Sequence, residues 1–151
     1  MHSRPGNDDG STVRPLYYAA HTYMILGLIS GLAYREITKS AHFTGDTQLG
    51  LVHTHLLALG MLFFLVVLAL EKLFTLSASP LFRWFFWVYN AGLAITVTMM
   101  VIHGLQTVYG YSTSEAISGI AGLGHIVLTV GLVLLFIALG KQIPRTTREK
   151  A

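Results

Sequence analysis

Four long apolar segments constrain this chain of 151 residues more than any other feature. They run over residues 16–34, 48–70, 83–105 and 116–140. Each is long enough to cross the hydrocarbon core of a membrane, which takes about 20 helical residues. Charged residues make up only 11% of the chain, about half of what a soluble domain carries. We therefore expect an all-α integral membrane four-helix bundle.

Residues 15–141 are predicted to form this transmembrane domain, between disordered tails at 1–14 and 142–151. With four spans, both termini and the middle loop lie on one side of the membrane. That side carries eight of the ten basic residues, and the other side has only Arg35 and Lys39. The positive-inside rule then places both termini in the cytoplasm. Because the basic residues flank the spans, the net charge of +3 does not indicate nucleic-acid binding.

Histidine occurs in every apolar segment, and such residues inside a membrane are by default functional candidates. The five are His21, His53, His55, His103 and His125. A rise of about 1.5 Å per residue places the last four in the outer half of the membrane. His21 falls about 6 Å towards the cytoplasmic side by the same estimate, where it could serve a second site or pair with a neighbouring subunit.

Imidazoles from facing helices at similar depth favour a b-type haem. Without cysteine, the chain cannot attach a c-type haem or supply a thiolate ligand. The first-choice axial pair is His55 with His125, since three glycines before His125 leave room for a porphyrin. The second choice is His53 with His103. His53 and His55 lie about 200° apart around a helix, so they serve opposite faces.

Three functions remain open at this stage. The leading one is a b-type haem protein, a dimer, that transfers electrons between a quinone or a redox partner protein and an acceptor, or reacts with a small gas. The second is copper or zinc handling, with His55, His125, His53 and His103 as ligands. Their depths spread over about 10 Å, which disfavours one tetrahedral site. The third is a cofactor-free assembly subunit in which the histidines bond helices together.

No aspartate or glutamate falls within the predicted spans, so a proton pump built on carboxylates is not expected. The small residues Gly27 and Gly31 are suited to tight helix packing or dimerisation.

Several motifs resemble a bacterial family of four-span membrane proteins whose function is unknown. They are Tyr34-Arg35-Glu36-Ile37-Thr38-Lys39, Leu51-Val52-His53-Thr54-His55-Leu56-Leu57, Tyr89-Asn90-Ala91-Gly92 and residues 117–125. The resemblance covers nearly the whole chain. It implies the four-span architecture and a multi-pass place in the bacterial inner membrane, but no activity.

A shorter resemblance concerns the catalytic subunit of haem-copper oxidases. That subunit carries a His-x-His pair on one helix and a His-Gly on another, and His53-Thr54-His55 and His103-Gly104 are similar. This resemblance implies haem ligation by these residues. The His-Pro-Glu and His-His copper-binding motifs of that subunit are absent, so oxygen reduction is not implied.

Overall fold

The computed structural model describes residues 9–112 and 115–143. All regular elements in this part of the chain are helices, which confirms the predicted all-α class. The elements are α1 (Asp9–Ser40), α2 (Leu49–His55), the π-helical segment η1 (Leu56–Leu62), α3 (Phe63–Phe74), the 3-10 turn η2 (Leu76–Ala78), α4 (Pro80–Tyr109) and α5 (Glu115–Gln142). α2, η1 and α3 follow one another without a break and together form the second span.

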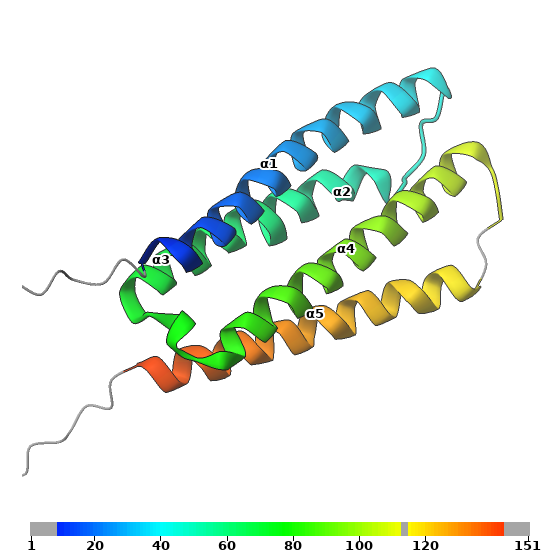
Figure 1. Cartoon of the computed structure of the whole chain (residues 1–151). Helices are drawn as coiled ribbons and strands as arrows, with labels where there is room; N and C mark the ends of the chain where they lie inside the picture. Colours follow the sequence, from blue (N-terminus) through cyan, green and yellow to red (C-terminus); the bar gives the residue numbers. More distant parts are fainter. Residues whose placement is uncertain (1–8, 113–114, 144–151) are drawn as a thin grey trace, which may run out of the picture.

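Four helices are long and apolar enough to cross a membrane: Val13–Ser40, Leu49–Phe74, Pro80–Tyr109 and Gly119–Gln142. They extend several residues beyond the apolar segments of the sequence. The reason is that backbone hydrogen bonding continues into polar flanking turns, whereas hydropathy detects only the apolar part. The first turn of α1 and the last turn of α5 lie at the same end of the molecule (Figure 1).

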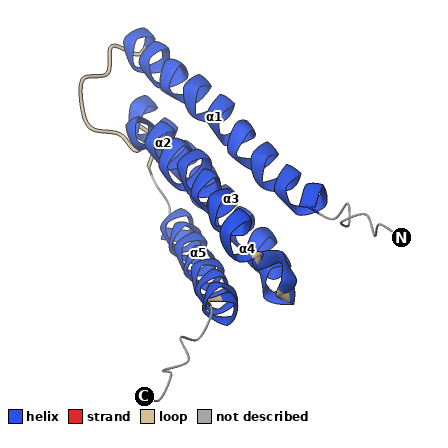
Figure 2. Cartoon of the chain, turned by 90° about the vertical axis from the view of Figure 1, so that its left-hand side faces the viewer, coloured by secondary structure: helices blue, strands red, loops and turns tan. Residues whose placement is uncertain are grey.

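The helices pack in the order α1, α2–α3, α4, α5. α1 runs along α2, η1 and α3, α2 contacts α4, and the most extensive contact is between α4 and α5. Two perpendicular views place α1 and α5 at opposite edges of the fold (Figures 1 and 2). α1 therefore packs on one side of the α2–α4 pair, and α5 packs on another side.

Glycines at the helix contacts bring backbones close together. A Cβ atom on Gly92 would lie 2.6 Å from the backbone nitrogen of Leu128 on α5, and one on Gly104 would lie 2.6 Å from that of Leu49 on α2. Substituents larger than hydrogen do not fit at these two positions. The two contacts fix how far each neighbouring helix is shifted along α4.

The aromatic core and the described basic residues other than Arg35 and Lys39 occupy the half of the molecule that contains η2. Phe63 stacks on Tyr89 with ring centroids 4.3 Å apart, and Phe64 and Phe85 surround them. We call this half the inner half. The inner half is packed by aromatic rings, while the opposite, outer half carries four of the five histidines of the spans.

Candidate functional site in the outer half

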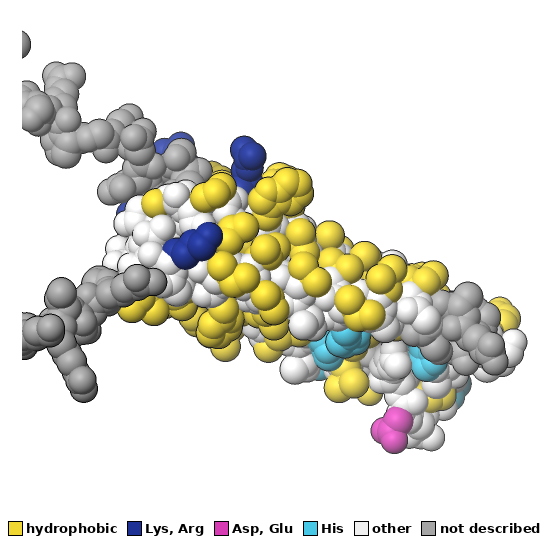
Figure 3. Space-filling model, turned by 90° about the horizontal axis from the view of Figure 1, so that it is seen from below, with side chains coloured by type: hydrophobic (Ala, Val, Ile, Leu, Met, Phe, Trp, Pro, Cys, Tyr) yellow, Lys and Arg dark blue, Asp and Glu magenta, His cyan; other side chains and the backbone are white. Residues whose placement is uncertain are grey.

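On the face of the molecule seen in Figure 3, histidine side chains gather away from the lysines and arginines of that face. Their heights can be compared through α4, because α2 and α5 both run antiparallel to it. Leu49 lies against Gly104 and Gly124 lies against Thr96. Counting along the helices then places His55 level with about residue 98 of α4 and His125 level with about residue 95. The two histidines differ in height by about 4.5 Å.

His55 and His125 make the same hydrogen bond. Nδ1 of His55 donates to the carbonyl oxygen of Leu51 at 3.0 Å, and Nδ1 of His125 donates to that of Ala121 at 2.9 Å. A carbonyl oxygen only accepts, so in both rings the proton is on Nδ1. The lone pair of Nε2 is therefore available, which is the state in which an imidazole ligates a metal.

The two rings also lie on the same side of the fold. On α2, Gly50 and His53 face α1, since a Cβ on Gly31 would lie 3.6 Å from Cβ of His53. Two residues further along the helix, His55 is turned about 200° from His53, and so points to the side that carries α5. On α5, Gly124 faces α4. The next residue, His125, is turned by about 100°, and the right-handed sense of the helix directs it towards α2.

Both rings reach the apolar surface. His125 is exposed and His55 is half-buried, and the neighbouring side chains Leu51 and Ile126 are 54% and 62% exposed. Imidazoles in contact with lipid are costly. A bound group or a second copy of the chain would remove this cost.

The second predicted pair, His53 and His103, is arranged differently. His53 faces α1 rather than α4, and its Nε2 lies 3.4 Å from Oγ1 of Thr54. Nδ1 of His53 and Nδ1 of His103 are both buried and have no hydrogen-bond partner within the described residues. His53 is thus directed at α1, and neither ring makes the Nδ1 bond seen in His55 and His125.

His103 lines a cavity of about 610 Å³ at the outer end of α2 and α4. The other lining residues are Tyr34, Asp46, Thr47, Gln48, Gly50, Leu51 and Thr107. Leu51 lies one turn before His55 on α2, and His55 itself does not line the cavity.

His21 lies apart from the other four. It is exposed on α1 and stacks on Tyr17, with ring centroids 5.8 Å apart. Since Gly31 is level with His53, His21 lies about 15 Å further towards the inner half.

The glycines before His125 have separate environments. A Cβ atom on Gly119 or Gly122 would meet no other atom within 4 Å, whereas one on Gly124 would lie 2.6 Å from Oγ1 of Thr96. The space at Gly124 is therefore taken by α4. Only the surface at Gly119 and Gly122 is open to another group.

No three histidine, aspartate or glutamate side chains in the described ranges lie close enough to hold a metal ion together. A site of three or four such ligands is thus not formed by that part of one chain. A haem needs only a pair of imidazole ligands, which is fewer than such a metal site needs.

Glu71 is a polar residue that the hydropathy of the sequence places outside the second span. The structure places it inside the span Leu49–Phe74, where it is 6% exposed. Its carboxylate accepts hydrogen bonds from the backbone nitrogen of Ser77, at 2.9 Å, and from the Ser77 hydroxyl. The second helix thus continues past the predicted span 48–70, and its last turn contains a buried carboxylate. The apolar residues Leu73 and Phe74, which follow Glu71 and Lys72, are the signal that the span continues.

The family model for a protein of unknown function, DUF2871, matches residues 13–142. The chain belongs to the DUF2871 family. The match covers all four spans, and this membership confirms the resemblance to a four-span family of unknown function. No curated protein and no solved structure matches the chain.

Proposed function

We propose that this DUF2871 protein is a membrane b-type haem protein in which His55 and His125 hold the iron. The observation that supports it best is their shared hydrogen bond from Nδ1 to the carbonyl oxygen four residues earlier. Of the described histidines, these two have a ring nitrogen bonded in this way. The bond fixes the tautomer and the ring orientation and raises the basicity of Nε2.

The surroundings of the pair fit a haem. Both rings are on one side of the fold, at heights that differ by about 4.5 Å, and are flanked by exposed apolar side chains. An apolar macrocycle would cover these side chains and withdraw the imidazoles from lipid. When bound, haem supplies electron transfer or the binding of a small gas. The protein holds and orients the iron and keeps water away.

The surface position of the rings also favours a dimer. A group held by His55 and His125 on one copy would remain open on one face, and a second copy could cover it. We propose a homodimer in the bacterial inner membrane, with the termini in the cytoplasm and a quinone or a redox protein as partner. The excess of lysine and arginine at the inner end supports this orientation.

The test is the visible spectrum of the protein purified in mild detergent. We expect a Soret band that shifts on reduction with dithionite and is lost in His55→Ala and in His125→Ala. The matched control is His21→Ala, since His21 also lies within a span, is exposed and is remote from the pair. It should retain the full ratio of haem to protein.

Other outcomes point to other functions. A colourless protein that contains stoichiometric copper or zinc by elemental analysis would favour metal handling. A colourless protein without metal, after expression with added haem precursor, would contradict the haem proposal and leave a cofactor-free assembly subunit. Equal loss of haem in all three variants would show that the spectrum reports folding and not ligation.

A further inference from the structure

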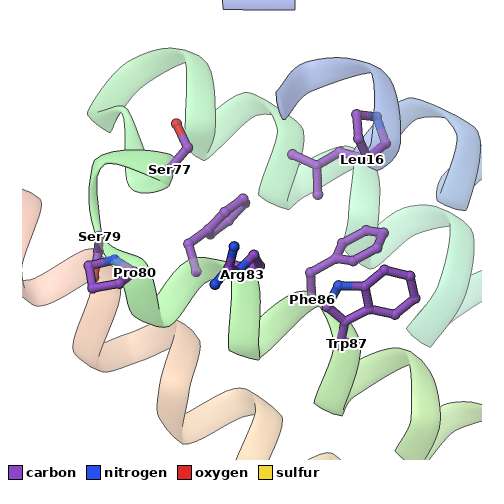
Figure 4. Close-up of a pocket in the computed structure, with 9 residues that line it drawn as sticks. Leu16, Ser77, Ser79, Pro80, Arg83, Phe86 and Trp87 are labelled. Carbon is purple, nitrogen blue, oxygen red and sulfur yellow. The ribbon is translucent and has the colours of Figure 1, made fainter. Parts of the chain in front are cut away.

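A groove of about 640 Å³ lies between α1 and α4. Both helices pack on the second span, and Leu56 of η1 lines the groove as well. At the inner end, Phe86 and Trp87 also line a second cavity, where Figure 4 shows them with Leu16. The walls are mostly apolar with a few polar side chains, which is typical of sites for small apolar ligands.

One face of α4 presents a polar, a small and a second polar side chain to this groove. Asn90, Ala94 and Thr98 all line it and are spaced by four residues, so they follow one another along the helix. Asn90 and Thr98 are about 12 Å apart along the helix axis. Ala94 is exposed between them and leaves room for a flat group.

Both polar side chains have hydrogens to donate. Asn90 accepts a hydrogen bond from the Tyr23 hydroxyl at 2.7 Å and donates one from Nδ2 to the carbonyl oxygen of Phe86 at 2.6 Å. An amide nitrogen has two hydrogens, so one remains. Thr98 is exposed and, unlike Thr129, does not donate to the carbonyl oxygen four residues earlier within the described structure. Unpaired polar hydrogens are costly in lipid, so the groove suits a ligand with acceptor oxygens.

The spacing of the two donors matches a para-quinone. The carbonyl oxygens of such a ring lie roughly 5 Å apart, and a hydrogen bond of about 2.9 Å to each gives a span of about 11 Å. The flat ring would then lie over Ala94. Leu26 of α1 lines the facing wall, and Tyr23, about one turn before it, bonds to Asn90. Leu26 is therefore at about the height of Ala94, and the two side chains can hold the ring between them.

The groove reaches the height of the proposed haem ligand His55. Counting from the contact of α2 with α4 places His55 level with about Thr98, and Leu56, the next residue, lines the groove. The His55 ring points to the side that carries α5. A head group at Thr98 is therefore separated from this ring by the width of one helix, about 10 Å.

From this arrangement we infer a binding site for a quinone in the groove between α1 and α4. One carbonyl oxygen accepts a hydrogen bond from Nδ2 of Asn90, the other accepts one from the Thr98 hydroxyl, and the apolar tail lies against Phe86 and Trp87. Ala94 is near the middle of the span Pro80–Tyr109, where an acyl chain of a lipid supplies no acceptor oxygen. The role of the quinone as a redox partner rests on the proposed function, but its binding needs no haem.

The two tryptophans of the chain provide the assay. Trp84 and Trp87 are 62% and 66% exposed, but only Trp87 lines the groove. Trp84→Phe therefore leaves a reporter in the site, and Trp87→Phe leaves a reporter outside it. Each variant is titrated in mild detergent with decylubiquinone, a quinone that quenches tryptophan fluorescence.

We expect saturable quenching of Trp87 and weaker, non-saturating quenching of Trp84. In the Trp84→Phe background, Thr98→Val should raise the half-saturating quinone concentration about fivefold, because one hydrogen bond to a carbonyl oxygen is lost. The matched control is Thr129→Val, since Thr129 is an exposed threonine of α5 and does not line the groove. It should leave the half-saturating concentration within about twofold.

Asn90→Leu removes the other donor and should raise the half-saturating concentration by a similar factor. Because it also removes the acceptor of the Tyr23 hydroxyl, Tyr23→Phe is measured beside it. Tyr23→Phe breaks the same bond between α1 and α4 but keeps Nδ2, and should have the smaller effect. His125→Ala, in which haem is expected to be lost, should bind the quinone as before. Saturable quenching in a protein that never binds haem would contradict the proposed function and support this site alone.

Other results overturn the inference. Equal quenching of Trp87 and Trp84 would show only partition of the quinone into the micelle. Displacement by decylbenzene, which has the tail without the carbonyls, would identify a lipid chain as the occupant. A free quinone concentration at half-saturation that rises with protein concentration would identify a second copy of the chain. Equal effects of Asn90→Leu and Tyr23→Phe, with none from Thr98→Val, would show that the carbonyls are not recognised.

Discussion

His55 and His125 donate the same hydrogen bond from Nδ1, to the carbonyl oxygens of Leu51 and Ala121, at 3.0 and 2.9 Å. They belong to different hairpins of the fold, one on α2 and the other on α5. Two rings in separate spans thus present Nε2 with the same tautomer and at nearly the same height. This equivalence distinguishes the two from His53, His103 and His21.

The first prediction concerns the two histidines outside this pair. His53→Ala and His103→Ala should each keep more than about half of the haem bound by the unmodified protein, because His53 faces α1 and neither ring has the Nδ1 bond of an oriented ligand. The measurement is the pyridine haemochrome per mole of protein. Loss of haem in His53→Ala or His103→Ala, with His55→Ala unaffected, would assign the iron to the other pair.

The second prediction concerns the contact between α4 and α5. Gly92→Ala should lower the free energy of unfolding by about 1–3 kcal/mol, because the new Cβ would lie 2.6 Å from the backbone nitrogen of Leu128 and force the helices apart. Thermal unfolding in detergent measures this. Gly122→Ala is the control, since its Cβ would meet no atom within 4 Å. It should be neutral or stabilising, and equal losses in both variants would contradict this account of the packing.

The third prediction concerns Glu71. Glu71→Ala should destabilise the protein by about 1–3 kcal/mol, since the backbone nitrogen and hydroxyl of Ser77 would lose their acceptor in a buried place. Glu71→Gln, which keeps an acceptor oxygen, should lose less. The exposed Glu36→Gln is the control and should be unchanged in the same unfolding assay. Were Glu71→Ala as stable as the control, the carboxylate would have no structural role.

The fourth prediction concerns Thr75, which ends α3 in the left-handed region with φ of 51°. This conformation is strained for a β-branched side chain and is the ordinary one for glycine at the end of a helix. Thr75→Gly should raise the free energy of unfolding by about 1 kcal/mol. Thr44→Gly, in a loop position whose φ is not positive, should give no gain. A loss of stability in Thr75→Gly would show that the threonine makes a compensating contact.

The four spans could be predicted because each needs only a long apolar run. The gathering of His53, His55, His103 and His125 in the outer half could also be predicted, since helix rise and alternating direction fix depth. The direction of each ring could not be predicted in the same way. It depends on which face of α2 packs on α1 and which on α4, and residues such as Gly31 and Gly104 reveal this only once their partners are known.

Two further features depend on contacts that are distant in sequence. Charged residues usually mark the end of a span, so hydropathy alone ends the second span before Glu71, but the hydrogen bonds from Ser77 let this residue stay buried within the helix. The glycine spacing before His125 predicts one open surface. Only Gly119 and Gly122 are open, because Thr96 on α4 occupies the space next to Gly124.

The π-helical segment η1 separates the histidines of the second span from its aromatic half. Its hydrogen bonds close over five residues instead of four, so it contains more residues per turn than the helices on either side. Deleting one residue here, such as the exposed Ala58, would let the segment wind as an α-helix and leave His53 and His55 close to their present direction relative to Phe64, because seven π-helical residues turn through nearly the same angle as six α-helical ones. The wider winding of this short stretch therefore absorbs one residue, so that the imidazoles of the outer half and the aromatic rings of the inner half keep their separate faces.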